Sequence, residues 1–135
     1  MRLLIDTSAY SAFMRGHQEI KELFQVAEHL YLNPIILGEL YAGFQRGRKR
    51  SQNEALLHQF LQSPRVNIFP LDEETAERYS VILNTLWTGS TPIPTNDLWI
   101  AASAMQYGLE IVTTDSHFQK VVQVLVRHFS IPEKD

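Results

Sequence analysis

Four carboxylate side chains are placed where they could do chemistry together: Asp6, Glu39, Asp97 and Asp115, each at or near the end of a different predicted element. Clustered carboxylates repel one another and raise each other's pKa unless a cation neutralises them. Oxygen ligands without cysteine or paired histidine favour hard ions, so the set predicts a site for Mg²⁺ or Mn²⁺. One or two such ions can activate water and stabilise charge at phosphorus, which is the chemistry of phosphodiester hydrolysis.

Each of these acids, taken singly, also has an ordinary structural interpretation. Asp6 could form an Asx turn or cap the following helix, although Ser8 is available as the cap of a helix over 8–14. Asp97 opens a helix, where the macrodipole stabilises negative charge, and Asp115 could be a turn residue. Glu39 has apolar helical neighbours, and a carboxylate there is costly unless a cation or donor meets it. The set therefore carries more weight than its members.

The elements that must position these acids follow from the apolar pattern. Short apolar runs predict buried strands, and runs with helical spacing predict the helices between them. The strands are expected at 3–5, 30–32, 66–69, 111–113 and, weakly, 128–131; the helices at 8–14, 17–28, 35–44, 52–61, 73–86 and 97–107. This alternation predicts a three-layer α/β/α fold with a central parallel sheet of four to five strands. Ligands collect beyond the carboxyl ends of such strands, so Asp6 and Asp115 should face the same edge.

Length and composition set outer limits. The 135 residues fit one domain spanning 1–135, and 44% hydrophobic with 20% charged residues is typical of a globular protein. The absence of cysteine excludes a disulfide framework, a thiolate nucleophile, a cysteine zinc site and an iron–sulfur cluster. The apolar run at 3–5 is too short for a signal peptide, and no stretch has the length of a membrane span. We therefore expect a cytoplasmic protein with no membrane partner.

Charge is distributed unevenly along the chain. The net charge of −3 argues against binding duplex DNA by charge alone, because neutralising phosphates needs a basic surface. One segment is nevertheless basic, with Arg46, Arg48, Lys49 and Arg50 around Gly47. It could be a phosphate-contacting flank or simply a solvated helix end. An acidic chain with one basic segment could hold divalent cations in one place and phosphate in another.

Four segments together resemble a known family. The segments are LIDTS (4–8), NPIILGELYAG (33–43), IPTNDLWIAA (93–102) and IVTTDSHF (111–118). In this order, over nearly the whole chain, they look like the PIN domain, and most of all the VapC-type toxins of toxin–antitoxin pairs. The resemblance implies a parallel sheet flanked by helices and a Mg²⁺- or Mn²⁺-dependent endoribonuclease acting on single-stranded or structured RNA. It also implies a homodimer and a cognate antitoxin that inserts a segment into the active-site groove.

The resemblance also implies roles for individual residues. Asp6, Glu39, Asp97 and Asp115 match the family's acidic quartet, with Asp6 and Asp97 as the principal metal ligands. Ser8 or Thr113 matches the small hydroxyl residue that supports the metal or its water. Many members carry a further acid where this chain has His117, which we expect to be a surface or supporting residue rather than a ligand. The basic run gains a third interpretation, as a contact for the antitoxin's acidic tail.

Two alternatives stay open at this point. A PIN-like domain without turnover could work as an RNA- or protein-binding module, although a pure binder has no reason to keep four clustered acids. A Mg²⁺-dependent phosphohydrolase of small molecules could also use such a site. The sequence Asp6-Thr7-Ser8 lacks the Asp-x-Asp expected after the first strand of the commonest haloacid-dehalogenase-like version.

Overall fold

Five parallel strands form the centre of the structure, a computed structural model that describes residues 1–132. The strand order is β3-β2-β1-β4-β5, so the first strand of the chain lies in the middle of the sheet. After the exposed Arg2, the middle strand is buried: Leu3, Leu4 and Ile5 are each 0% exposed. The strands are β1 (Arg2–Ile5), β2 (His29–Leu32), β3 (Val66–Ile68), β4 (Glu110–Thr113) and β5 (Leu125–His128).

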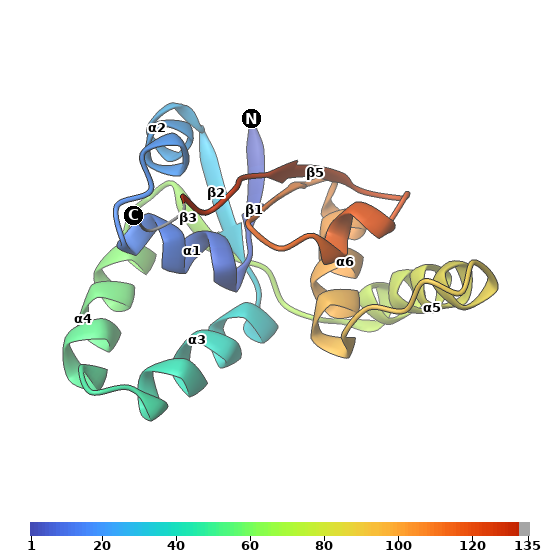
Figure 1. Cartoon of the computed structure of the whole chain (residues 1–135), viewed down its shortest axis with the longest axis horizontal. Coiled ribbons are helices and arrows are strands. Elements are labelled where there is room, and N and C mark those ends of the chain that lie inside the picture. The colour runs from blue at the N-terminus through green and yellow to red at the C-terminus, as the bar shows by residue number, and fades with distance from the viewer. Residues whose placement is uncertain (133–135) are drawn as a thin grey trace.

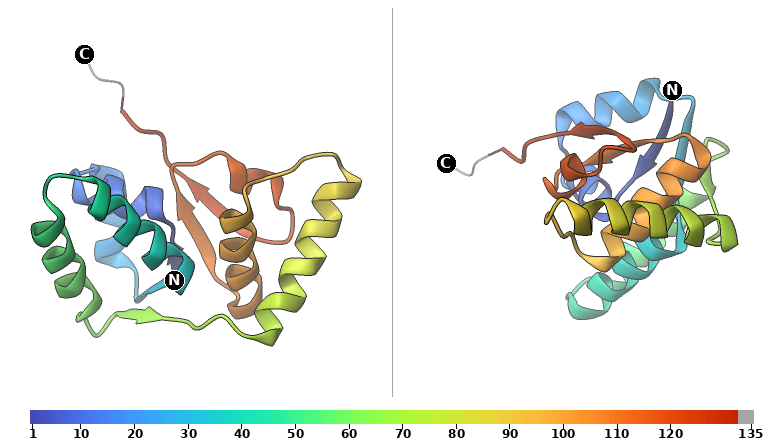
Figure 2. Two further views of the ribbon diagram at one scale, coloured as in Figure 1. Left: turned by 90° about the horizontal axis from the view of Figure 1, so that it is seen from below. Right: turned by 90° about the vertical axis from the view of Figure 1, so that its right-hand side faces the viewer.

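Helices connect the strands and flank the sheet (Figure 1). Helices α5 and α6 lie together on one side of the sheet, and helices α1 to α4 lie on the other side (Figure 2). The helices are α1 (Thr7–Met14), α2 (Gln18–Val26), α3 (Pro34–Arg46), α4 (Arg50–Leu61), α5 (Glu73–Thr88) and α6 (Thr95–Tyr107), with a short 3₁₀ helix, η1 (His117–Lys120). None of the helices within residues 1–132 combines the length and apolar character needed to cross a bilayer. The predicted α/β fold with a parallel sheet is confirmed.

Three predicted boundaries are wrong in detail. Asp6, not Ser8, caps α1: its Oδ1 accepts a hydrogen bond from the backbone N–H of Ala9 at 2.8 Å. The helix α6 begins at Thr95, before Asp97, because the fixed φ of Pro94 suits the cap position. The last strand is β5 rather than 128–131, because its register is set by pairing with β4 from Glu110↔Leu125 onwards.

Two local features set the ends of helices α5 and α6. Asp72 and Thr75 form a reciprocal capping box at the start of α5, in which each side chain accepts from the other residue's backbone N–H. Gly108 ends α6 in the left-handed conformation (φ 65°), which a residue without a Cβ adopts at low cost. These signals fix the ends of the two helices that pack together beside the sheet.

A buried polar pair joins the two helices that carry candidate acids. Asn33 caps α3 by accepting from the N–H of Ile36 at 2.9 Å, and its amide donates to the hydroxyl of Ser103 on α6, also at 2.9 Å. Both side chains are 0% exposed. Because buried polar groups are costly unless they are paired, this contact fixes α3 against α6. It thereby fixes Glu39 relative to Asp97.

Candidate active site

Asp6 lies at the carboxyl end of β1 and is almost fully buried, with 4% of its surface exposed. Its carboxylate accepts three hydrogen bonds: from Ser8 at 2.7 Å, from the Ala9 N–H at 2.8 Å and from Thr113 at 2.5 Å. Burial raises the pKa of Asp6 from its ordinary 3.8 to about 6, even though these three donors lower it. Asp6 is therefore a carboxylate that the fold holds rigidly and at an electrostatic cost.

Two hydroxyl groups connect Asp6 to the turn after β4. The Thr113 hydroxyl accepts from the N–H of Asp115, and the Ser8 hydroxyl accepts from the N–H of Thr114, both at 2.9 Å. The two hydroxyls lie 3.2 Å apart. Ser8 and Thr113, both candidates from the sequence, thus orient Asp6 and Asp115 relative to each other. The expectation that these two acids face one edge of the sheet agrees with this geometry.

Asp97 is the acid at the centre of the group. It lies in the first turn of α6, half-buried, with 13% of its side chain exposed. Burial is the main cause that raises the pKa of Asp97; a hydrogen bond from His117 lowers it, and the charges of Asp115 and Glu39 raise it further. The charge of Asp97 in turn raises the pKa of Asp6. Asp97 therefore interacts with all three other acids of the predicted set.

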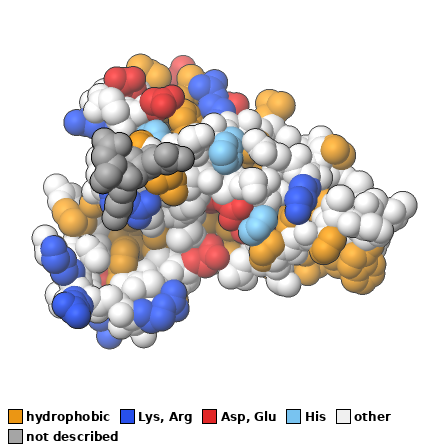
Figure 3. All heavy atoms as spheres, in the orientation of Figure 1, with side chains coloured by type: hydrophobic (Ala, Val, Ile, Leu, Met, Phe, Trp, Pro, Cys, Tyr) orange, Lys and Arg blue, Asp and Glu red, His pale blue; other side chains and the backbone are white. Residues whose placement is uncertain are grey.

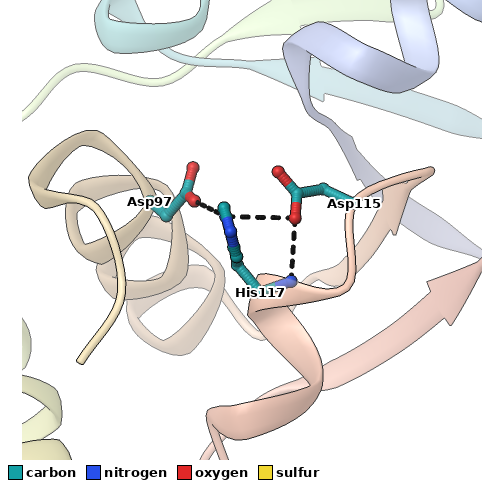
Figure 4. A group of neighbouring side chains, drawn as sticks. All are labelled: Asp97, Asp115 and His117. Carbon is teal, nitrogen blue, oxygen red and sulfur yellow. Dashed lines mark hydrogen bonds and ion pairs between the residues drawn. The ribbon is translucent and has the colours of Figure 1, made fainter. Parts of the chain in front are cut away.

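His117 bridges two of these acids (Figure 4). Its Nδ1 lies 2.8 Å from Oδ2 of Asp97 and 3.0 Å from Oδ1 of Asp115, which also accepts the backbone N–H of His117 at 2.8 Å. One ligand atom from each of the three residues fits within 4.8 Å of the others. We expected only a surface or supporting role for His117, and its position between two carboxylates was not foreseen. The sequence did offer one signal for a place in the site, because His117 lies two residues after Asp115 in the fourth segment that resembles the family.

Glu39 contributes from α3, across the site from the sheet. Its Oε1 accepts from the Thr7 hydroxyl at 2.6 Å and its Oε2 from the Asn96 amide at 3.3 Å. The sequence placed Glu39 beside apolar helical neighbours, where a carboxylate needs a cation or a donor, and the structure supplies two donors next to an open groove. Thr7 and Asn96 were not selected from the sequence, although each directly adjoins a selected acid, Asp6 or Asp97.

The groove next to Glu39 has a volume of about 550 Å³ and runs along α3 to the basic segment. It is lined by Thr7, Pro34, Ile35, Gly38, Glu39, Ala42, Arg46 and Asn96. Arg46 is the last residue of α3, and the basic side chains gather around the turn between α3 and α4 (Figure 3). Arg50, by contrast, pairs with Glu54 at 2.9 Å on α4. Of the four basic candidates, Arg46 is the one that lines the groove.

The chemistry of the donor set fits a divalent cation. Asp6, Asp97, Asp115 and Glu39 supply carboxylate oxygens from four separate elements, and His117 adds a ring nitrogen. Such oxygens are typical ligands of Mg²⁺ and Mn²⁺, and a bound cation would offset the repulsion by Asp115 and Glu39 that adds to burial in raising the pKa of Asp97.

The sequence matches the PIN-domain family over residues 3–123, and the chain therefore belongs to that family. Ribonuclease VapC of Rickettsia bellii (strain RML369-C) is 30% identical over 138 residues that cover all of both chains. Ribonuclease VapC1 of Rickettsia felis (strain ATCC VR-1525 / URRWXCal2) is 31% identical over 127 residues, 93% of each chain. Within the PIN-domain family, the chain is thus a member of the VapC ribonucleases. The resemblance seen in the four segments is confirmed.

Solved structures show the same fold. VapBC2 from Rickettsia felis, bound to a DNA fragment from its promoter, matches with a TM-score of 0.85 and 21% identity, over 95% of this chain and 98% of that one. FitAcB from Neisseria gonorrhoeae matches with a TM-score of 0.76 and 28% identity, over 92% and 95%. Both likenesses cover more than nine tenths of each chain, so this chain shares the fold of these proteins.

Proposed function

We propose that this VapC-family ribonuclease hydrolyses RNA phosphodiester bonds as the toxin of a toxin–antitoxin pair, with a Mg²⁺- or Mn²⁺-dependent site formed by Asp6, Glu39, Asp97 and Asp115. The observation that carries the proposal is the grouping of Asp97, Asp115 and His117, whose ligand atoms lie within 4.8 Å of one another, and the Thr113 hydroxyl, which bonds both the Asp6 carboxylate and the Asp115 N–H. Carboxylates that are close together repel one another, and a bound cation removes this repulsion.

The roles of the chain's own residues follow from their surroundings. Asp6 is the most buried of the four acids, and the side chain of Asp97 is less exposed than that of Asp115, 13% against 34%. Asp6 and Asp97 would therefore hold the cation, while Asp115 and Glu39 would complete the site. When bound, the cation supplies positive charge at the reacting phosphate and activates water for attack. One of the carboxylates would accept the proton of the attacking water. Thr113 and Ser8 keep Asp6 and Asp115 in position through their hydroxyl groups.

We propose the groove along α3 as the path of the RNA strand. Glu39 lies at its end next to the acids, and Arg46 lies two helical turns away on the same helix. A guanidinium at that distance can pair with a backbone phosphate beyond the cleaved one. The remaining basic side chains, Arg48, Lys49 and Arg50, extend the positive surface around the turn after α3. Acting on RNA, the protein would work in the cytoplasm.

A cognate antitoxin is the expected protein partner. VapBC-5 from Mycobacterium tuberculosis is a member of the VapBC family of toxin–antitoxin systems, and a toxin–antitoxin complex from Klebsiella pneumoniae has the same fold as the present chain. The groove that would guide RNA is also the surface that an inhibitor must cover. We therefore propose that the antitoxin inserts a segment there, with acidic residues near Arg46.

We also propose that two copies of the chain pair through α5. Trp87 is 67% exposed and Val81 47% exposed on this helix, and hydrophobic side chains gather at its end (Figure 3). Beside Trp87 runs an apolar groove of about 270 Å³ lined by Leu83, Ile93 and their neighbours. A projecting ring next to a groove is the self-complementary surface that a two-fold interface requires. Light scattering on the wild type and on Trp87→Ser tests this: a dimer should become a monomer, and a monomeric wild type would refute it.

The proposed function is tested by cleavage of single-stranded RNA with purified protein in Mg²⁺, Mn²⁺ or EDTA. Wild-type protein should cleave only with metal, and Asp97→Asn should lose more than about 100-fold, because even residues that only orient ligands are worth 10–100-fold. Glu74→Gln is the matched control, since Glu74 is an exposed acid in the first turn of α5. A folded wild-type protein that binds metal but cleaves no RNA would instead favour the binding-module alternative.

A further inference from the structure

His117 occupies a position that the sequence pattern of the acids does not explain. It is the first residue of η1, and the turn between β4 and η1 brings its ring to the mouth of the site. A single ring nitrogen, Nδ1, is within hydrogen-bond distance of carboxylate oxygens from two elements, Asp97 of α6 and Asp115 of the turn. The ring is partly accessible, with 39% of the side chain exposed. A cation bound by both carboxylates would therefore lie next to this nitrogen.

The identity of the donor atoms decides which cation such a site prefers. Mg²⁺ binds oxygen ligands and keeps much of its water, whereas imidazole nitrogen is a ligand of transition metals. Along the series of divalent ions, affinity for nitrogen-containing sites increases from Mn²⁺ towards Cu²⁺. A site of carboxylates alone, by contrast, suits Mg²⁺, Ca²⁺ and Mn²⁺ alike. Replacing one oxygen donor by nitrogen shifts the preference away from Mg²⁺.

We propose that His117 is a nitrogen ligand of the active-site cation through Nδ1, and that this chain consequently prefers Mn²⁺ to Mg²⁺. The proposal rests on the proposed function, because it concerns the same metal site. In the structure Nδ1 faces the two carboxylates as a hydrogen-bond donor would. Coordination requires the other neutral tautomer, with the proton on Nε2 and the Nδ1 lone pair towards the ion. In that state Asp97 and Asp115 would both contact the cation, whereas in the structure they both contact Nδ1 of the ring.

The surroundings of His117 favour this role over that of a simple hydrogen-bond partner. Its backbone N–H already donates to Asp115 Oδ1 at 2.8 Å, so the main chain fixes the distance between ring and carboxylate. Phe118, the next residue, is 1% exposed and anchors η1 in the core. The ring is thus presented to the acids by a fixed turn, which is how ligands of metal sites are held.

The experiment is pulsed electron paramagnetic resonance on Mn²⁺ bound to the full chain, which detects a coordinated ¹⁴N nucleus directly. Wild-type protein should show ¹⁴N modulation, and His117→Asn should bind Mn²⁺ without it. The control is His29→Asn, an exposed histidine at the amino end of β2, which should keep the modulation. Competition between Mn²⁺ and Mg²⁺, followed by the signal of free Mn²⁺, should show the preference for Mn²⁺ fall by about 10-fold in His117→Asp.

The outcomes separate this inference from the proposed function. Bound Mn²⁺ without ¹⁴N modulation in the wild type overturns the nitrogen ligand, and it leaves the ribonuclease proposal standing if metal-dependent cleavage is observed. Modulation that persists in His117→Asn overturns it equally, because another nitrogen must then be the ligand. Failure of the wild type to bind Mn²⁺ at all, together with no metal-dependent cleavage, overturns both proposals. The wild-type spectrum alone can refute the inference, so the test does not depend on whether the variants fold.

Discussion

The hydroxyl of Thr113 donates a hydrogen bond of 2.5 Å to Oδ2 of Asp6 and thereby joins the carboxyl ends of β1 and β4 through side chains. The hydroxyl oxygen of Thr113 also accepts a hydrogen bond from the N–H of Asp115 at 2.9 Å. Since β1 and β4 are neighbours in the sheet, the bond adds no long-range constraint to the fold. Its effect is local: it sets the separation of two acids that are proposed to share a cation.

Replacing Thr113 by Val should therefore weaken metal binding without unfolding the protein. Val keeps the β-branched shape that suits a buried strand but leaves Asp6 and the Asp115 N–H without their shared partner. We expect a 10–100-fold loss in Mn²⁺ affinity and in RNA cleavage, measured by titration and by gel assay. Thr113→Ser, which keeps a hydroxyl, should lose much less. Equal losses in both variants would assign Thr113 a packing role.

The raised pKa of Asp6 predicts how stability depends on pH in the absence of metal. Because the pKa is 3.8 unfolded and about 6 folded, the native state binds more protons between these values, and stability falls as pH rises through this window. The full loss is on the order of 3 kcal/mol. Urea unfolding in EDTA at pH 4, 5 and 6.5 should show this fall relative to Asp6→Asn. Parallel profiles for the two proteins would mean that Asp6 is not strained by burial.

Asn33 should matter for stability although it is distant from any substrate. Replacing it by Ala removes the cap of α3, worth about 1 kcal/mol, and leaves the buried Ser103 hydroxyl without its donor. Together we expect a loss of about 2–3 kcal/mol in urea unfolding. Asn33→Asp, which retains an acceptor for the Ile36 N–H, should recover part of the cap. A loss under about 0.5 kcal/mol in Asn33→Ala would contradict the role assigned to this contact.

Arg46 and Arg50 should differ in their effect on RNA binding. Arg46 lines the groove, whereas Arg50 is paired with Glu54 at 2.9 Å. Arg46→Ala should lower the slope of log affinity against log salt by about 0.7, the value for one phosphate contact to a single strand. Arg50→Ala should change it little. Fluorescence anisotropy with labelled RNA in EDTA measures both slopes, and the opposite ranking would move the RNA path away from the groove.

Tyr10 offers a simple gain in stability. Its ring is buried, 2% exposed, and packs edge-on against Phe60 with centroids 5.3 Å apart. Its hydroxyl has no hydrogen-bond partner within the described part of the chain, and burial raises its pKa to about 12. Tyr10→Phe removes this uncompensated polar group and should stabilise the fold by about 1 kcal/mol in thermal or urea unfolding. Destabilisation would indicate that the hydroxyl has a partner such as a buried water molecule.

Much of this arrangement could be predicted from the sequence because the period of the apolar residues fixes where strands end. Asp6 and Asp115 follow buried runs directly, and parallel strands bring such positions to one edge. The cap of α1 could not be predicted in the same way. Asp6 and Ser8 are both good cap residues. Only the structure shows that the Asp6 carboxylate accepts hydrogen bonds both from the Ala9 N–H and from the Ser8 hydroxyl.

The surroundings of Glu39 and the position of the His117 ring could not be predicted from the pattern of apolar residues, for a different reason. A helical projection shows which residues neighbour Glu39 on α3, but not that Thr7 and Asn96 from other elements face it. The direction of the His117 ring depends on the exact turn between β4 and η1, which residue types do not specify. The position of β5 was missed because the run 121–126 lacks alternation and β5 lies at the sheet edge, with Leu125 73% exposed.

The glycine at position 38 has a consequence for how substrate range can change. Gly38 lies in the interior of α3 and lines the groove, and a Cβ built there would meet nothing within 4 Å. Helix interiors lose up to about 1 kcal/mol by carrying glycine instead of alanine. The helix therefore gives up stability where no packing demands it, and the result is a wider channel. A bulkier residue would narrow the groove while strengthening the helix, so the proposed RNA path could be reshaped at this position with no loss of folding stability.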